Sequence, residues 1–366
     1  MPRQIVMVCN ISNTKEPAKR VSRATGRQKG WRFHGLSAMK ICVYGAGAMG
    51  GLLGARLAAA GEAVTLVARG RHLAAMRKDG LRLVAQDGEI VVTPPCTDDP
   101  ATLGAQDVVV LAVKANALRG AADSIRPLLG PHTVLVPALN GVPWWYFYKL
   151  AGPHEDRRLA SIDPGGALWD KLPPSRVIGC VVYAAGEIVA PGIVRSSASE
   201  TFLLGDPAGR LGERVAAFSA VCEKAGLSAP VSPDIRQALW IKLWGNLSFN
   251  PLSVLTGATL DRLALEPESR DVARRMMVEA RAVGERLGIA FPMDVDRRMA
   301  MAEGLVGHKT SMLQDFEQRR ALEIDALLGA VIEMAGLVGV ATPTCEIILA
   351  LVRQRARIAG CATAAT

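Results

Sequence analysis

Three glycines at a fixed spacing constrain this chain more than any other feature of its sequence. They form the pattern Gly45-x-Gly47-x-x-Gly50, which lies between an apolar run at 40–44 and a segment at 48–60 with helical spacing of Ala, Leu and Met. The apolar run predicts a strand, and the glycines form the turn that leads into the helix. This local order is typical of a βαβ unit.

Strands and helices alternate through the residues that follow. Apolar runs predict strands at 63–68, 107–113 and 133–136, with a helix at 117–129. Such alternation predicts a parallel, Rossmann-type doubly wound sheet. Residues 177–206 look β-rich, and an amphipathic helix at 211–225 is expected to close this part of the chain.

Beyond Pro230 and Pro233 the strand signals nearly vanish. Helical patterns are predicted over 234–249, 266–287, 293–306, 311–335 and 343–357. With 366 residues the chain is long enough for two cores. We therefore expect an α/β domain at 39–229 followed by an all-helical domain at 230–366.

The glycine pattern is the fingerprint of a dinucleotide-binding turn. The first glycine permits the tight turn, the second lets a diphosphate approach the backbone, and the third lets helix and strand pack closely. The amino end of the helix offers N–H donors and partial positive charge to the phosphates. The expected cofactor-binding residues of this turn are Gly45, Ala46, Gly47, Ala48, Met49 and Gly50.

The end of the second strand indicates which dinucleotide binds. NAD sites usually carry an acid there, whereas this chain has Arg69 and Arg71 and no carboxylate between residues 66 and 72. A carboxylate would repel a 2′-phosphate, while Arg69 can hold it through charge-assisted hydrogen bonds. These arginines could also belong to a solvated loop. The pattern favours NADPH as the cofactor.

The net charge of +9 comes mostly from a basic leader at 1–38. That leader carries eight Lys or Arg and one acid, which leaves +2 for the remainder of the chain. It could precede the native start, act as a transit peptide, or be a solvated tail. Because the rest of the chain lacks a basic surface pattern interleaved with aromatics, we expect no nucleic-acid partner.

The seven scattered cysteines form no C-x-x-C pair, and the five histidines form no cluster with metal-ligand spacing. We therefore expect a cytoplasmic protein with no metal. No apolar run reaches the eighteen residues of a membrane span, so no membrane partner is expected either.

A row of polar residues interrupts the most apolar helical segment. Lys242, Asn246 and Asn250 recur every fourth residue and share one helix face, and Pro251 after them is expected to make the helix irregular. A lysine and two amides in apolar surroundings need partners or a ligand. They could instead be a snorkelling lysine and two capping amides.

Four further residues could join that row. Lys114 and Asn140 follow strands, at the edge where doubly wound sheets bind ligands, although each could be an ordinary loop residue. Ser311 begins Ser-x-x-Gln, which could be a simple capping box. Glu323 has small apolar neighbours, so we expect a buried carboxylate whose partner is Lys242.

These motifs together resemble the ketopantoate reductase (2-dehydropantoate 2-reductase) family over nearly all of 39–357. The resemblance is carried by the glycine turn, Val113-Lys114-Ala115, Asn140-Gly141, Lys242-Leu243-x-x-Asn246-x-x-x-Asn250-Pro251, Ser311-Met312-Leu313-Gln314-Asp315 and Glu323-Ile324-Asp325. Two features depart from the family pattern: His308 stands where asparagine is common, and residues 142–147 are unusually aromatic. The aromatic segment could pack in the core or reshape the substrate pocket.

The resemblance implies NADPH-dependent reduction of ketopantoate, or of a close 2-keto acid, in pantothenate biosynthesis. It implies that Lys242 is the general acid and that Glu323 lies beside lysine and substrate. It also implies that Asn246, Asn250 and Ser311 bind the substrate's hydroxyl and carboxylate groups, and that Lys114 and Asn140 line the cleft. The rival interpretations are a 3-hydroxyacid or sugar-acid dehydrogenase of similar plan and an NADP(H)-binding redox sensor without turnover. A homodimer is left open.

Overall fold

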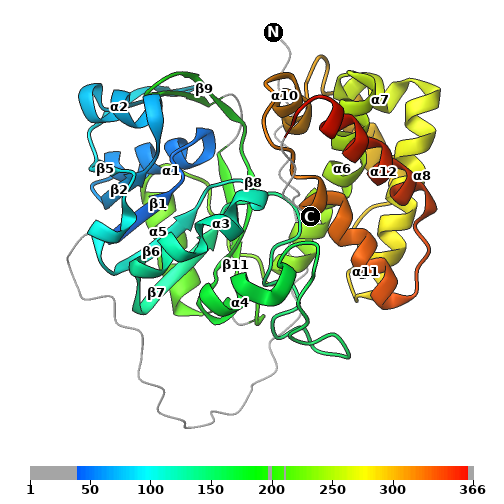
Figure 1. The fold of residues 1–366 in the computed structure, drawn as a ribbon, viewed down its shortest axis with the longest axis horizontal. Coiled ribbons are helices and arrows are strands. Elements are labelled where there is room, and N and C mark those ends of the chain that lie inside the picture. Colours follow the sequence, from blue (N-terminus) through cyan, green and yellow to red (C-terminus); the bar gives the residue numbers. More distant parts are fainter. Residues whose placement is uncertain (1–38, 197–199, 210–211, 362–366) are drawn as a thin grey trace, which may run out of the picture. The chain divides into compact units, whose positions relative to one another are not determined.

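The computed structural model of the protein describes residues 39–196, 200–209 and 212–361 (Figure 1). The basic leader at 1–38 lies outside the described residues. Within them, no helix is both long enough and apolar enough to cross a lipid bilayer.

A five-stranded parallel sheet forms the centre of the α/β half. Its strand order is β5-β2-β1-β6-β7. The central strands are buried because helices cover both faces, which explains their continuous apolar sequences. The strands are β1 (Lys40–Tyr44), β2 (Ala63–Val67), β5 (Cys96–Thr97), β6 (Gln106–Leu111) and β7 (Leu129–Pro137).

Helix α1 (Ala48–Ala59) lies between this sheet and a second one. It contacts β1 and β2 on one side and all four strands of the second sheet on the other. The second sheet has the order β4-β3-β10-β9 and comprises β3 (Leu81–Ala85), β4 (Gly88–Val92), β9 (Gly186–Ala190) and β10 (Ile193–Ser196). The expectation of a β-rich segment at 177–206 is confirmed, whereas β3 and β4 were not expected.

The remaining elements of the α/β half flank the main sheet. Strands β8 (Gly179–Tyr183) and β11 (Thr201–Gly205) pair with each other in antiparallel fashion. The helices are α2 (Gly70–Asp79), α3 (Ala115–Ile125), α4 (Ala167–Lys171) and α5 (Glu213–Lys224). The expected domain boundary near residue 230 falls between α5 and the next helix and stays a prediction.

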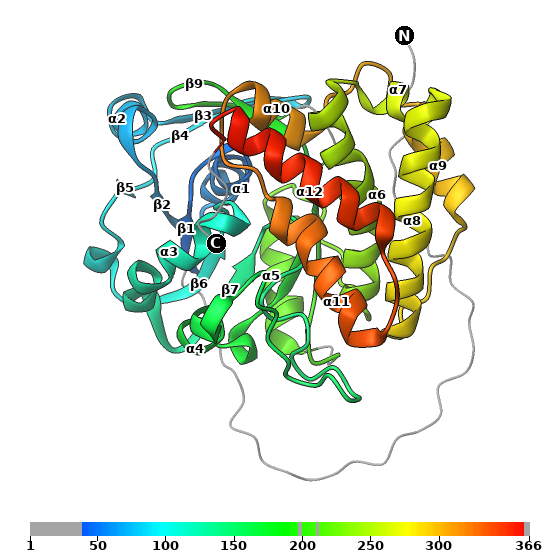
Figure 2. The same ribbon diagram turned by 45° about the vertical axis from the view of Figure 1, so that its right-hand side comes forward.

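The helical half packs around α6 (Ile235–Thr256), as Figure 2 shows. Trp240 and Trp244 of this helix are fully buried. Around it lie α7 (Leu260–Leu265), α8 (Pro267–Arg286), α9 (Val295–Glu303), α10 (Ser311–Glu317), α11 (Ala330–Val338) and α12 (Pro343–Ile358). The expected irregularity at Pro251 does not end α6, which continues for another turn to Thr256.

The expectation of one helix over 311–335 is wrong. Helix α10 ends at Glu317, and helical structure resumes only with a π-helical turn at Asp325–Gly329 that leads into α11. Arg319 adopts a left-handed backbone (φ 52°), and the N–H of Arg320 bonds back to the carbonyl of Asp315. The break positions residues 321–323 beside the α/β half, where the candidate site lies.

Candidate active site

The glycine turn after β1 is shaped by two of its glycines. Gly45 has a φ of +102°, and its N–H and that of Ala46 both donate to the carbonyl of Val67 at the end of β2. A Cβ on Gly50 would lie 2.1 Å from the carbonyl oxygen of Gly45, so this position needs glycine for close packing. The turn therefore binds the start of α1 tightly to the sheet edge.

Gly47, by contrast, has open space around it. A Cβ added there would meet no heavy atom within 4 Å, although Gly47 is the N-cap of α1. The first turn of α1 contains no acidic residue, and the amides of a first helical turn have no acceptor within the helix. The backbone N–H groups beside this open space could hold the diphosphate of a dinucleotide.

Arg69 lies where the sequence places it, just beyond the end of β2. It is the N-cap of α2, and both Arg69 and Arg71 are exposed to solvent. Helix α2 has no acid in its first turn. The segment after the carboxyl end of β2 is thus basic, and the first turn of α2 has no carboxylate that would repel an anionic group.

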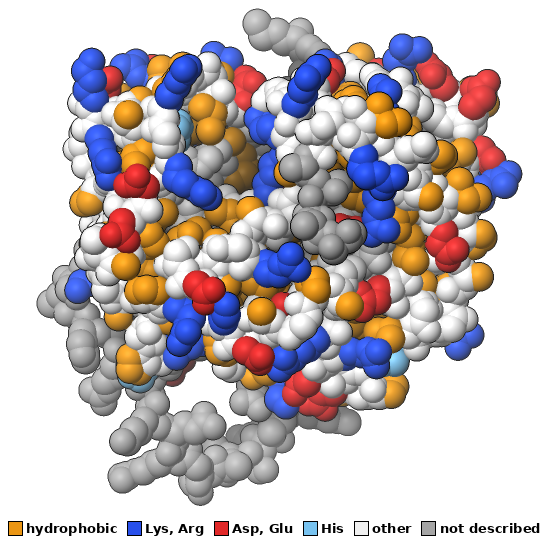
Figure 3. Space-filling view, in the orientation of Figure 1, with side chains coloured by type: hydrophobic (Ala, Val, Ile, Leu, Met, Phe, Trp, Pro, Cys, Tyr) orange, Lys and Arg blue, Asp and Glu red, His pale blue; other side chains and the backbone are white. Residues whose placement is uncertain are grey.

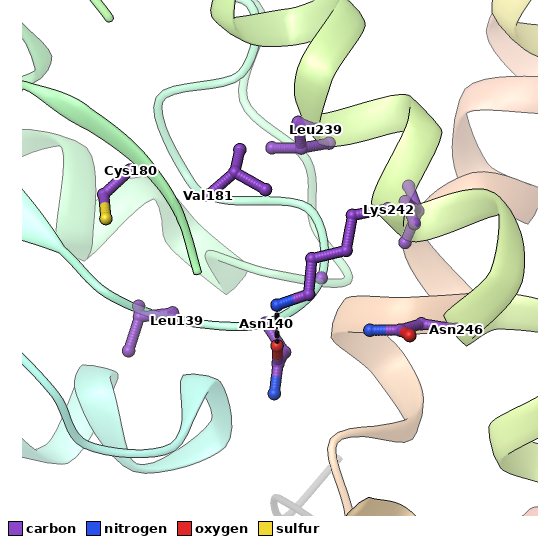
Figure 4. A pocket seen from close by; sticks show the side chains of 9 residues that line it. Leu139, Asn140, Cys180, Val181, Leu239, Lys242 and Asn246 are labelled. Carbon is purple, nitrogen blue, oxygen red and sulfur yellow. Dashed lines mark hydrogen bonds between the residues drawn. The ribbon is translucent and has the colours of Figure 1, made fainter. Parts of the chain in front are cut away.

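The ammonium of Lys242 points from α6 toward the loop after β7. Its Nζ donates to Oδ1 of Asn140 at 2.7 Å. The side chains of Leu139, Val181 and Leu239 line the same cavity (Figure 4). Burial lowers the pKa of Lys242 to about 8, although the charge of Glu323 opposes this shift. A lysine in this environment can give up its proton near neutral pH.

Glu323 receives two hydrogen bonds from the α/β half. The N–H of Ala115, at the start of α3, donates to Oε1 at 2.8 Å, and Nδ2 of Asn140 lies 3.4 Å from Oε2. The expectation that Lys242 pairs directly with Glu323 is therefore wrong, because the amide of Asn140 lies between them. Burial raises the pKa of Glu323, and the Ala115 N–H opposes that rise.

Lys114 reaches across to the helical half. Its Nζ lies 2.6 Å from Oδ2 of Asp315 and donates to the carbonyl of Ala321 at 2.9 Å. Asp315 is buried and also accepts from Arg320 at 2.8 Å. Sequence reasoning quoted Asp315 within a motif but assigned it no part. A role for Lys114 at the cofactor stays a prediction.

The other expected substrate-binding residues are placed differently from one another. Asn246, one turn after Lys242 on α6, lines the same cavity, and Asn250 is buried one turn further along. Ser311 is exposed at the first position of α10. The capping-box interpretation of Ser311 is wrong, since Thr310 is the N-cap and accepts from the N–H of Leu313.

The loop after β7 also brings the backbones of the two halves into direct contact. Gly141 has a φ of +82°, and a Cβ on it would lie 2.4 Å from the carbonyl oxygen of Ala326. The N–H of Val142 donates to the same carbonyl at 2.7 Å. Asn140 is therefore held against the π-helical turn by its own neighbours.

The cavity at Lys242 has a volume of about 20 Å³, which is room for one water molecule. Leu139, Asn140, Cys180, Val181, Leu239, Leu243 and Asn246 line it with Lys242 and Gly141. The aromatic segment does not: Trp144, Trp145, Tyr146 and Phe147 are each at most 3 % exposed and pack in the core. Among the described residues, no group of three His, Cys, Asp or Glu could hold a metal ion.

A parallel sheet with a glycine turn, joined to a helical domain that contributes a buried ammonium, defines a dinucleotide-dependent oxidoreductase of two domains. Comparison with known proteins gives the family. The family model described as "Ketopantoate reductase PanE/ApbA" matches residues 41–209, and its C-terminal counterpart matches residues 234–356. The chain belongs to the ketopantoate reductase family.

Individual relatives agree with this placement. A protein from Mesorhizobium japonicum named 2-dehydropantoate 2-reductase is 53% identical over 88% of this chain and 99% of its own length. A crystal structure from Ralstonia solanacearum MolK2, described as a candidate ketopantoate reductase, is 44% identical with a TM-score of 0.85, covering 89% of this chain and 100% of that one. A PanE/ApbA family ketopantoate reductase from Ralstonia eutropha JMP134 is 28% identical with a TM-score of 0.75, covering 88% and 99%.

Proposed function

We propose that this protein reduces 2-dehydropantoate (ketopantoate) to pantoate with NADPH, a step of pantothenate biosynthesis. The observation that carries the proposal is the buried ammonium of Lys242, bonded to Asn140 and with a pKa lowered to about 8. A proton donor near neutral pH is what reduction of a keto group requires. The 53% identical relative bears the name of this activity.

The cofactor's diphosphate would be held by the backbone of the glycine turn, and its 2′-phosphate by Arg69. The open space at Gly47 and the basic edge of β2 support this assignment. When bound, NADPH supplies the hydride, while the protein supplies binding, orientation and charge. Lys114 and Asn140 would line the cleft between cofactor and substrate.

Lys242 would act as the general acid. Negative charge grows on the substrate's carbonyl oxygen during reduction, so an ammonium beside it stabilises the transition state and then transfers a proton from Nζ. Asn140 holds that Nζ in place, and Glu323 in turn orients Asn140. Asn246, Asn250 and Ser311 would bind the hydroxyl and carboxylate groups of the substrate.

We place this activity in the cytoplasm, as a homodimer that acts on a small 2-keto acid. The described cysteines are all free thiols, and most of them are buried, which suits a reducing compartment.

A screen of NADPH oxidation over a panel of 2-keto acids tests the proposed function. Ketopantoate is expected to give the highest kcat/KM of the panel. Strong NAD(P)-linked oxidation of 3-hydroxyacids without ketopantoate turnover would instead establish the dehydrogenase of similar plan. Tight NADPH binding without turnover of any member of either panel would establish a sensor.

A further inference from the structure

His72 joins the first turn of α2 to a distant part of the α/β half. It lies three residues after Arg69, and its side chain is half-buried. Its Nδ1 accepts a hydrogen bond from the N–H of Gly192 at 3.0 Å, although Gly192 comes 120 residues later in the chain. Gly192 lies in the turn between β9 and β10 of the second sheet. The start of α2 is thereby tied to that sheet.

The imidazole of His72 is also enclosed beside the glycine turn. Burial lowers the pKa of His72, and the carbonyl of Ala46 in the glycine turn opposes this shift. Nε2 is buried and makes no full hydrogen bond to a described residue. The ring is therefore neutral at neutral pH, and because Nδ1 accepts a hydrogen bond, the ring proton is on Nε2.

Gly192 provides a fixed anchor for His72. Its φ is +80°, and a Cβ added to it would lie 3.1 Å from the Cβ of Ala75 on α2, so a larger residue would crowd that helix. Its carbonyl accepts from the N–H of Arg82 on β3 at 2.9 Å. Because both backbone groups of Gly192 are bonded, the position of His72 follows that of the second sheet.

The two segments proposed to bind phosphate groups therefore meet at His72. The glycine turn, which contains Ala46, is proposed to hold the diphosphate, and Arg69 at the N-cap of α2 is proposed to hold the 2′-phosphate. Figure 3 shows Lys and Arg side chains over α2, on a face that is hollowed between the α/β half and the helical half. The distance between the two segments depends on where α2 begins, and His72 holds that first turn in place.

We propose that His72 is a positioning residue for cofactor selectivity: it fixes the start of α2 relative to the glycine turn and so favours NADPH over NADH. The inference rests on the proposed binding of the 2′-phosphate by Arg69. NADH has the same diphosphate but no 2′-phosphate. A first turn of α2 that has moved should therefore lose the contact that only NADPH makes and keep the contact that both cofactors make.

Dissociation constants of the full chain for NADPH and for NADH, measured by fluorescence titration, test this inference. His72→Leu keeps a side chain of similar size but leaves the N–H of Gly192 without its acceptor. This variant is expected to bind NADPH about tenfold more weakly or worse, and NADH less than about threefold more weakly. If His72→Leu does not fold, His72→Ala takes its place with the same expectation.

His72→Asn is the conservative variant. Its side-chain amide can present an oxygen close to the position of Nδ1, so it can still accept from the N–H of Gly192. It is expected to bind both cofactors within about threefold of wild type. A histidine that only filled space would not be replaced by the smaller, polar asparagine.

Met76→Ala is the control for lost packing. Met76 is buried one turn further along α2. Its truncation is expected to lower the melting temperature of the protein, because it leaves a cavity, and to preserve the ratio of the two dissociation constants. A loss of NADPH preference in Met76→Ala equal to that in His72→Leu would mean that any damage to α2 has this effect, and it would overturn the inference.

Three further results would overturn it: wild-type NADPH affinity in His72→Leu, equal losses for NADPH and NADH in that variant, or His72→Asn as weak as His72→Leu. The titrations need no substrate, so selective NADPH binding through His72 without ketopantoate turnover contradicts only the proposed reaction. A wild-type protein without NADPH preference contradicts both this inference and the assignment of Arg69. Preference that is lost in Arg69→Asp but kept in His72→Leu contradicts this inference alone.

Discussion

Nζ of Lys242 and Oδ1 of Asn140 lie 2.7 Å apart, and this hydrogen bond joins α6 to the loop after β7. Asn140 uses its other amide atom toward Glu323, so a neutral group separates the ammonium from the carboxylate. A direct ion pair would hold the lysine firmly protonated. With the amide between them, burial dominates, and the pKa of Lys242 falls toward the pH at which it can release a proton.

The first prediction concerns pH. Reduction needs Lys242 protonated, and its pKa is lowered to about 8, so the charged form predominates below that pH and disappears above it. The rate of ketopantoate reduction should therefore fall about tenfold per pH unit above about 8. Steady-state rates between about pH 6 and 10 measure this profile.

Lys242→Arg is the control for that profile. A guanidinium keeps its proton throughout the range, so this variant should be slow but without the fall above pH 8. If the wild-type rate stays constant to pH 10, or if both proteins show the same fall, the pH dependence does not come from Lys242.

The second prediction contrasts two glycines of one turn. Gly47→Ala should fold normally, because its Cβ meets no protein atom, yet bind NADPH at least about tenfold more weakly by filling the space proposed for the diphosphate. Gly50→Ala should lower the free energy of unfolding by about 1–3 kcal/mol, because its Cβ would overlap the carbonyl of Gly45. Cofactor titration and chemical denaturation distinguish the two. Normal NADPH affinity in Gly47→Ala would place the diphosphate elsewhere.

The third prediction concerns the choice of dinucleotide. Arg69 is exposed at the start of α2, where it is proposed to hold the 2′-phosphate. Arg69→Asp should raise the KM for NADPH by about 100-fold or more and change that for NADH far less. Arg77→Asp is the control for Arg69→Asp, because Arg77 lies on the same helix but is paired with Asp98. Equal losses for both cofactors in Arg69→Asp would refute the phosphate assignment.

The fourth prediction concerns the ion pair between the halves. Asp315 is buried and accepts from both Lys114 and Arg320, so Asp315→Ala should lower the free energy of unfolding by about 3 kcal/mol. Glu317, two residues after Asp315, forms an exposed ion pair with Lys309. Glu317→Ala should therefore lower the free energy of unfolding by less than about 1 kcal/mol. Denaturant titrations of both variants provide the comparison. Equal losses would mean that the burial of Asp315 contributes nothing.

Four strands of the main sheet, β1, β2, β6 and β7, could be predicted because they are mostly buried and therefore carry largely apolar sequences, whereas the two-residue strand β5 was not expected. Strands β3 and β4 were not predicted: in β3 the exposed Arg82 interrupts the apolar residues, and β4 is a largely exposed edge strand whose apolar run is only Ile90, Val91 and Val92. The break after α10 was also invisible, since residues 318–320 are ordinary helix formers. It depends on the bond from the N–H of Arg320 to the carbonyl of Asp315, next to the ion pair with Lys114.

In the candidate site, the residues could be predicted but their contacts could not. Lys114, Asn140 and Lys242 could be predicted as site residues because strand ends and a polar row on an apolar helix are local patterns. The way they connect is tertiary: Lys114 binds Asp315, and Asn140 separates Lys242 from Glu323. Spacing along the chain carries no information about an amide that bridges two charges.

The most direct test of the account is the turnover of Lys242→Ala. We predict that kcat for ketopantoate reduction falls by roughly 10²–10⁴-fold while the dissociation constant for NADPH, measured by fluorescence titration, stays within about threefold of wild type. Turnover equal to that of the wild-type protein would contradict the assignment of Lys242 as the proton donor.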